Sequence, residues 1–107
     1  MNTQTFTQNG ITFTAKICGE QIANEYGDKM PQVCNLTFNG ETYNAGDIIN
    51  VSPPEGSMFE GEEQYKIERI NQAKNGNIVI VGRTARGSSD VFFPRKWNRI
   101  TKQKFSQ

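Results

Sequence analysis

The chain has 107 residues, of which 35% are hydrophobic and 21% are charged, and this length suits one domain with a core of its own. It contains no histidine and two cysteines, so the most frequent catalytic base and metal ligand is missing. The composition disfavours most classes of enzyme and any transmembrane helix. We expect a single non-enzymatic domain over residues 1–107, with a flexible basic tail at 102–107.

The first third of the chain predicts two β-hairpins. Apolar and polar residues alternate from Ile11 to Cys18, which is the period of a strand with one buried face. Asn9-Gly10 precedes this strand and is typical of a two-residue hairpin turn, so Thr3–Gln8 should pair back on it. Val33–Phe38 followed by Asn39-Gly40 predicts a second hairpin of the same kind.

The segment that joins these hairpins is less clear. Residues 20–32 fit either a short helix around Gln21–Tyr26 or a long loop that ends near Pro31. In the strand that follows, alternation places Cys34, Leu36 and Phe38 on one side.

The middle of the chain reads as further short strands. A strand is expected at Asp47–Val51, and two prolines make 52–63 a loop. Tyr65–Ile70 is assigned as a strand because the β-prone run Asn77–Ala85 follows a turn at 74–76 and would pair with it. Four consecutive branched residues in this run indicate a central strand that is buried on both faces.

The last part predicts a turn at 87–90, a strand at Val91–Phe93 and a helical turn at Pro94–Trp97. A closing strand at 98–101 follows. Seven or eight short strands with turns between them indicate an all-β domain, and we predict a small barrel, SH3-like or OB-like, because closure removes exposed strand edges.

Three segments, Tyr43–Val51, Tyr65–Ile70 and Val91–Pro94, resemble SH3-like and bromo-adjacent-homology barrels. The resemblance covers about half of the chain. It implies a module that binds peptides, chromatin or nucleic acid, which agrees with a non-enzymatic function, but it implies no particular site residue. An OB-type barrel fits the number of strands almost as well.

The cysteines and acidic residues suggest no cofactor or metal. No export signal precedes the first strand, so we expect a cytoplasmic protein in which Cys18 and Cys34 are free thiols. Two cysteines cannot complete a structural zinc site. The acidic residues around position 60 lack the spacing of a calcium loop and read as a solvated segment.

Charge is divided unevenly along the sequence. Residues 1–63 contain two Lys or Arg against nine Asp or Glu, a net charge of −7, whereas residues 64–107 contain ten against two, a net charge of +8. Such asymmetry suggests a face that binds a polyanion. Alternatively, the two halves interleave in space and opposite charges meet across strands as weak surface pairs.

Our first hypothesis is a module that binds DNA or RNA mainly through phosphate contacts and with little sequence specificity. We expect no membrane partner for this module. Interleaved aromatic residues would stack on unpaired bases if exposed, but we expect Trp97 and one of Phe92 and Phe93 to lie in the core. The cations predicted to contact nucleic acid are Arg83, Arg86, Arg95, Lys96, Arg99 and Lys102.

The second hypothesis is a protein-interaction module or a small inhibitor of the kind that mobile genetic elements encode. Its acidic half would dock on a basic surface of a partner protein. Glu60, Glu62 and Glu63 are the residues predicted to make this contact. The sequence leaves DNA, RNA and protein partners open, as well as the oligomeric state.

Overall fold

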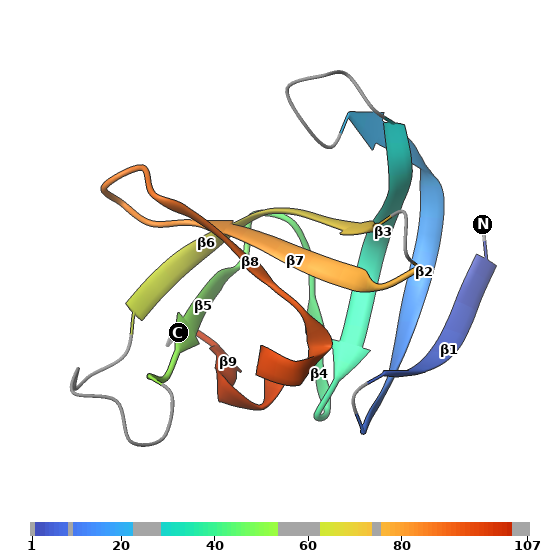
Figure 1. Cartoon of the computed structure of the whole chain (residues 1–107), viewed down its shortest axis with the longest axis horizontal. Coiled ribbons are helices and arrows are strands. Elements are labelled where there is room, and N and C mark those ends of the chain that lie inside the picture. The colour runs from blue at the N-terminus through green and yellow to red at the C-terminus, as the bar shows by residue number, and fades with distance from the viewer. Residues whose placement is uncertain (1, 9, 23–28, 54–62, 74–75, 104–107) are drawn as a thin grey trace, which may run out of the picture.

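The computed structural model describes residues 2–8, 10–22, 29–53, 63–73 and 76–103. In these residues the chain forms nine strands and one 3-10 helix, η1 (Figure 1). The elements are β1 (Asn2–Gln8), β2 (Ile11–Ile22), β3 (Lys29–Phe38), β4 (Glu41–Tyr43), β5 (Ile48–Val51), β6 (Glu63–Gln72), β7 (Ile78–Arg83), β8 (Ser89–Phe92), η1 (Pro94–Arg99) and β9 (Ile100–Lys102).

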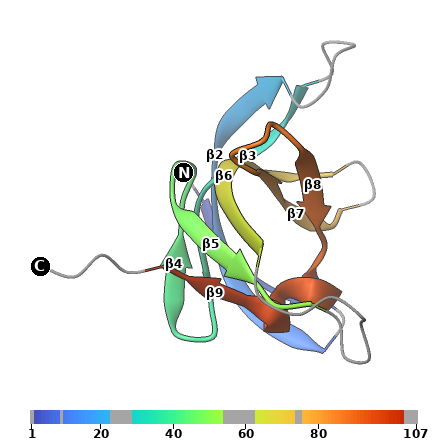
Figure 2. The same cartoon turned by 90° about the vertical axis from the view of Figure 1, so that its left-hand side faces the viewer.

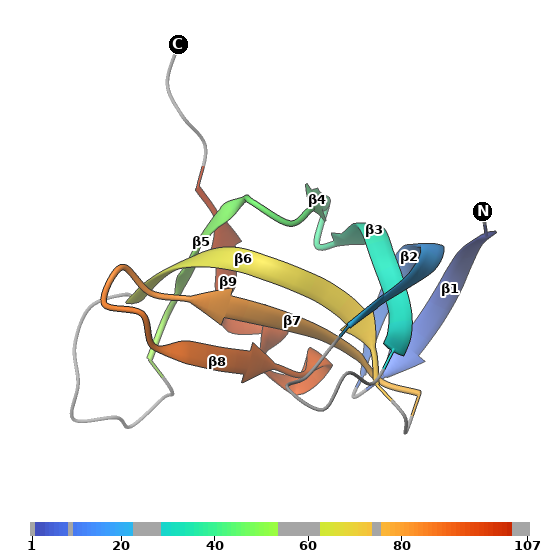
Figure 3. The ribbon, with the colours of Figure 1, turned by 90° about the horizontal axis from the view of Figure 1, so that it is seen from above.

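All strand pairs are antiparallel and belong to one strongly curled sheet. The hydrogen-bonded order is β1-β2-β3-β6-β5-β9, with β4 beside β3, β7 beside β6 and β8 beside β7. The β2–β3 pair crosses the β6–β7–β8 layer (Figure 1), and β5 and β9 curl toward η1 (Figures 2 and 3). The predicted all-β, barrel-like class is therefore confirmed, in the form of a half-barrel.

The two hairpins predicted from Asn-Gly pairs are both present. Gln8 pairs with Ile11, and Phe38 pairs with Glu41, so each loop has two residues. Asn39 and Gly40 have φ angles of 52° and 78°, the left-handed values that a type I′ turn requires at both central positions. Local turn chemistry therefore sets the register of both hairpins.

Two strands are longer than predicted. β2 continues through Ile22 and β3 begins at Lys29, so the helix expected around Gln21–Tyr26 is wrong for its first two residues. The alternative, a long loop over 20–32, is wrong for 20–22 and 29–32. The remainder, 23–28, lies outside the described residues. Pro31 is accommodated within β3, opposite Glu20.

The later strands agree more closely with the sequence pattern. β6 forms as expected, and residues 78–81 of β7 are all buried between β6 and β8. β8 begins at Ser89, two residues before the predicted strand. Of the expected tail, Lys102 ends β9, and the backbone N–H of Gln103 donates to the carbonyl of Ile48 (2.9 Å). Residues 104–107 lie outside the described residues.

The core centres on Trp97, which is fully buried. Its ring packs edge-on against Phe13 and stacks on Phe38, with centroids 4.7 Å away in both cases. Phe38 also stacks on Tyr43 at 4.4 Å. Trp97 and one of the two phenylalanines are thus core residues as predicted, and the structure shows that this phenylalanine is Phe92, whereas Phe93 is half-buried. This aromatic cluster (Phe13, Phe38, Tyr43 and Trp97) joins β2, β3, β4 and η1.

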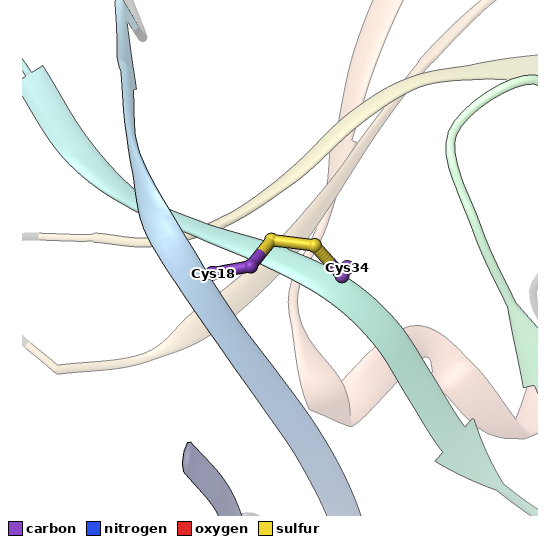
Figure 4. The surroundings of a disulfide bond; sticks show 2 residues. All are labelled: Cys18 and Cys34. Carbon is purple, nitrogen blue, oxygen red and sulfur yellow. A yellow bond between two sulfur atoms is a disulfide. The ribbon is translucent and has the colours of Figure 1, made fainter. Parts of the chain in front are cut away.

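The cysteines contradict the sequence-based prediction, because Cys18 and Cys34 form a disulfide between β2 and β3 (Figure 4). Lys16 pairs with Asn35, but Ile17 pairs with Val33, so Cys34 is the extra residue of a bulge. A second shift in register lies between Ile17 and Glu20. Val33 consequently enters the core, and the Cα atoms of the two cysteines lie 6.0 Å apart, within the usual span of a disulfide.

We predict that reduction of this disulfide, or the double substitution Cys18→Ser and Cys34→Ser, lowers the free energy of unfolding by about 3 kcal/mol. The sequence separation is 16, and closing a loop of about this length restricts the unfolded chain by that amount. Denaturation in guanidinium chloride with and without dithiothreitol measures the difference. The double variant, which has no disulfide, should not respond to dithiothreitol. Two reactive thiols in the unreduced, denatured protein would contradict the pairing.

Candidate nucleic-acid interface

The 3-10 helix η1 carries three of the six predicted contact residues. Its sequence is Pro94-Arg95-Lys96-Trp97-Asn98-Arg99. A 3-10 helix has three residues per turn, so side chains three positions apart lie on the same face. Pro94 and Trp97 are both buried and form the face that docks on the core. Arg95 and Asn98 share the second face, and Lys96 and Arg99 share the third.

Trp97 fixes the position of this helix. Its indole N–H donates a hydrogen bond of 3.0 Å to the carbonyl oxygen of Phe92, the last residue of β8. Proline at the first helical position favours the start of the helix, because its φ is already suitable. The cations of η1 are therefore attached to a segment that the core holds in place.

The cations of η1 form a compact group. Lys96 and Arg99 are half-exposed on one face, and Arg95 is exposed beside them. The Arg95 guanidinium lies 5.9 Å from the ring centroid of Phe93, within the range of a cation–π contact. Among the described residues, none of these three cations forms an ion pair with a carboxylate. We call Arg95, Lys96 and Arg99 the η1 cation group.

The other three predicted contact residues are neutralised by carboxylates. Arg83 Nη2 is 3.3 Å from Glu68 Oε1, and Arg86 Nη2 is 2.9 Å from Glu63 Oε1. Lys102 Nζ is 3.5 Å from Asp47 Oδ2, and it also donates a hydrogen bond of 2.7 Å to the carbonyl oxygen of Thr42. The structure therefore divides the predicted set into a group on η1 with no carboxylate partner among the described residues and three cations that each pair with a carboxylate.

One further cation, Lys66, lies beside Arg83 and is not among the six predicted contact residues. Lys66 on β6 lies directly opposite Arg83 on β7, and both line a shallow hollow of about 280 Å³ together with Tyr65 and Ile48. A bulge at Glu68, between the pairs Ile67–Gly82 and Arg69–Val81, produces this register. The positive charges of Lys66 and Arg83 repel each other across the strands. Glu68 reduces this repulsion because its carboxylate pairs with Arg83.

Tyr65 lies at the rim of this hollow, in a mixed electrostatic environment. Its hydroxyl donates to Asp90 Oδ2 at 3.4 Å, and its ring packs edge-on against Phe92. Gly82 leaves room for this packing, since a Cβ there would lie 3.0 Å from the Cβ of Tyr65. Burial raises the pKa of Tyr65, and the negative charge of Asp90 raises it further.

The acidic surface of the second hypothesis is described only in part. Glu63 begins β6 and is engaged by Arg86. Glu60 and Glu62 lie outside the described residues. Within the described part of the chain, no group of three or more Cys, Asp or Glu side chains is arranged to hold a metal ion.

Comparison of the chain with protein-family models, with curated proteins and with solved structures finds no match in any of the three. In the portion of the chain that the structure describes, no helix has the length and apolar character needed to cross a bilayer.

We predict that Trp97→Ala lowers the free energy of unfolding by about 3 to 5 kcal/mol, because the substitution leaves a large cavity in the aromatic cluster. Asn98→Ala is the matched control. Asn98 is exposed on the same helix, so its loss should change stability by less than about 0.5 kcal/mol. Denaturation followed by far-UV circular dichroism measures both. Equal effects of the two substitutions would contradict the anchoring role of Trp97.

A second prediction concerns alkaline pH. The folded protein holds the phenolic proton of Tyr65 more tightly than the unfolded chain does, because the pKa is raised on folding. The raised pKa adds to the free energy of unfolding. This contribution is fully present below the ordinary tyrosine pKa of about 10 and is lost as the pH rises through the pKa of Tyr65 in the folded protein. Between about pH 8 and 11, the wild type should therefore lose more stability than Tyr65→Phe. Identical losses in urea denaturation would contradict this.

Proposed function

We propose that the protein is a non-enzymatic module that binds nucleic acid through phosphate contacts made by the η1 cation group. One observation carries the proposal. Lys96 and Arg99 lie on one face of a helix that Trp97 holds against the core, with Arg95 beside them and no carboxylate partner among the described residues.

The charge arrangement supports this proposal over a purely structural role. Elsewhere in the described chain, Arg83, Arg86 and Lys102 each have a carboxylate partner. Like charges that share a helix face repel one another, although cations near a helix C-terminus are partly stabilised by its partial negative charge. A bound phosphate backbone would offset the remaining repulsion.

The expected mode of binding is electrostatic and tolerant of sequence. Phe92 and Trp97 are in the core, so they cannot stack on bases, and half-buried Phe93 lies beneath Arg95. Each neutralised phosphate releases condensed counterions. With three contacts, the slope of log affinity against log salt should be about −2 for single strands, so a fourfold rise in salt weakens binding about 20-fold.

The test compares two triple variants of equal net charge. Arg95→Gln, Lys96→Gln and Arg99→Gln together remove the η1 cation group, whereas Arg83→Gln, Arg86→Gln and Lys102→Gln remove the paired cations. Fluorescence anisotropy with labelled single-stranded DNA, duplex DNA and RNA at several salt concentrations gives the affinities. We expect the η1 variant to abolish the salt dependence and the control variant to retain most of it.

Two results would contradict the proposal. One is that the wild-type protein does not bind any of the three nucleic acids at low salt. The other is an equal loss in both triple variants, which would indicate a general effect of net charge. Stoichiometric capture of a basic protein that is weakened by charge reversal at Glu60, Glu62 and Glu63 would instead favour the interaction module.

The cytoplasmic location expected from the sequence stays a prediction, and the disulfide weighs against it. Disulfides such as Cys18–Cys34 persist mainly in oxidising compartments and are rare where thiols are kept reduced. Alkylation of the protein immediately on lysis of its own cells, followed by mass spectrometry, reports the native state of the two cysteines.

A further inference from the structure

The free edge of β1 differs from the other free edges of the sheet. Among the described strands, β4, β8 and β9 also pair on one side only. Each of these has three or four residues and contains a charged one, in turn Glu41, Asp90 and Lys102. β1 has seven residues, Asn2–Gln8, with no charge and no proline.

β1 also lacks the irregularities that usually protect an edge. It pairs with β2 in unbroken register from Asn2–Ile17 to Gln8–Ile11, so it contains no bulge. It lies at the margin of the sheet, and none of the other described strands lies beyond it (Figures 1 and 3). Natural proteins usually blunt such edges with charge, proline, bulges or short length, because unpaired N–H and C=O groups are a template for another strand.

The hairpin fixes which backbone groups face outward. In a two-residue hairpin, Gln8 and Ile11 close the turn as a hydrogen-bonded pair, and bonded and non-bonded pairs alternate from there. Thr7–Thr12 is then a non-bonded pair, whose side chains lie closer, and the two hydroxyls are indeed 3.1 Å apart. It follows that the N–H and C=O groups of Thr3, Thr5 and Thr7 point to the free edge.

The outward face of this sheet is rich in threonine. Thr5 pairs with Thr14, Thr14 with Thr37, and Thr37 with Thr42, so one threonine row crosses four strands. The Thr37 and Thr42 hydroxyls are 2.9 Å apart. Opposed threonines stabilise strand pairs through such contacts.

We propose that β1 pairs antiparallel with β1 of a second copy of this chain, around a twofold axis at Thr5. In this register Thr5 faces Thr5 of the other copy and Thr3 faces Thr7, so the threonine row continues through the axis. The outward groups of these three residues supply about six backbone hydrogen bonds. Only Thr5, on the axis, faces its own equivalent, but the symmetry duplicates every charge of the strand across the contact. An uncharged strand avoids the like-charge repulsion that would result.

The partner that best fits this edge is a second copy of the chain. β1 is uncharged, and its threonine row continues in register when it pairs with itself. A strand-to-strand contact is small compared with a standard interface of about 1,600 Å². We therefore expect a weak, reversible dimer with a dissociation constant between about 1 μM and 1 mM. The inference is independent of the η1 cation group, which lies on a different element.

The test combines oligomeric state with amide exchange on the wild-type protein. Sedimentation velocity from low to high micromolar concentration should show a monomer–dimer equilibrium. Residue-resolved hydrogen exchange by NMR should show the amides of Thr3, Thr5 and Thr7 becoming protected at high concentration. The amides of Gln4 and Phe6, which bond to β2, should be protected throughout.

Three variants separate the edge from general effects. Thr5→Pro removes an outward N–H without removing a β1–β2 bond, and Thr5→Lys sets two ammonium groups against each other at the axis. Both should weaken dimerisation at least tenfold. Thr12→Lys, one strand inward on the same face, should dimerise like the wild type. A protein that is monomeric at every concentration, or a dimer that tolerates both Thr5 substitutions, overturns the proposal.

Discussion

The packing of Trp97 between Phe13 and Phe38 is the interaction on which the rest of the molecule depends. Phe13 comes from β2, Phe38 from β3 and Trp97 from η1, so three segments far apart in sequence meet at one ring. The sheet path runs from β1 to β9 and, in the described residues, these two strands do not pair. Packing of side chains, and not a ladder of hydrogen bonds between β1 and β9, therefore completes the core.

This arrangement also determines which charges can act together. The difference between the −7 and +8 halves of the sequence is reduced in the folded chain, because Asp47, Glu63 and Glu68 each lie beside a cation from a later part of the sequence. Exposed pairs of this kind stabilise the fold by at most about 1 kcal/mol each. Their main effect is on the surface potential, since they leave η1 as the concentrated unpaired cation group of the described chain.

The features that could be predicted from sequence are those set by local chemistry. Asn39-Gly40 specifies a turn, alternation specifies the buried face of β2, and Pro94 specifies the start of a helical turn. Trp97 and one of Phe92 and Phe93 could be placed in the core because large apolar side chains dominate a core of this size, but the sequence did not show which phenylalanine it would be. The all-β class followed from the same signals.

What could not be predicted depends on bulges and on pairing between distant segments. With the turn closed by Gln72 and Ile78, a regular register would place Lys66 opposite Thr84, and the bulge at Glu68 moves it opposite Arg83. A bulge at Cys34 likewise turns that side chain away from the face of Leu36 and toward Cys18. A bulge bends its strand and increases the local twist, so its position depends on how distant strands pair. A linear count of charges likewise cannot show that Glu63 meets Arg86.

The open edge of β1 follows from the same geometry. Barrel closure had been expected because it removes edges, yet in this fold η1 and the aromatic cluster complete the core without joining β1 to β9. β9 is short and ends in Lys102, whose ammonium reaches Asp47 and the carbonyl of Thr42, so its edge is protected by charge. β1 has no such protection. Its side chains carry no charge, so they do not repel the same strand of a second copy. Because side chains complete the core without closing the sheet, β1 keeps a row of unpaired backbone N–H and C=O groups. In our proposal, β1 of a second copy of the chain pairs with these groups.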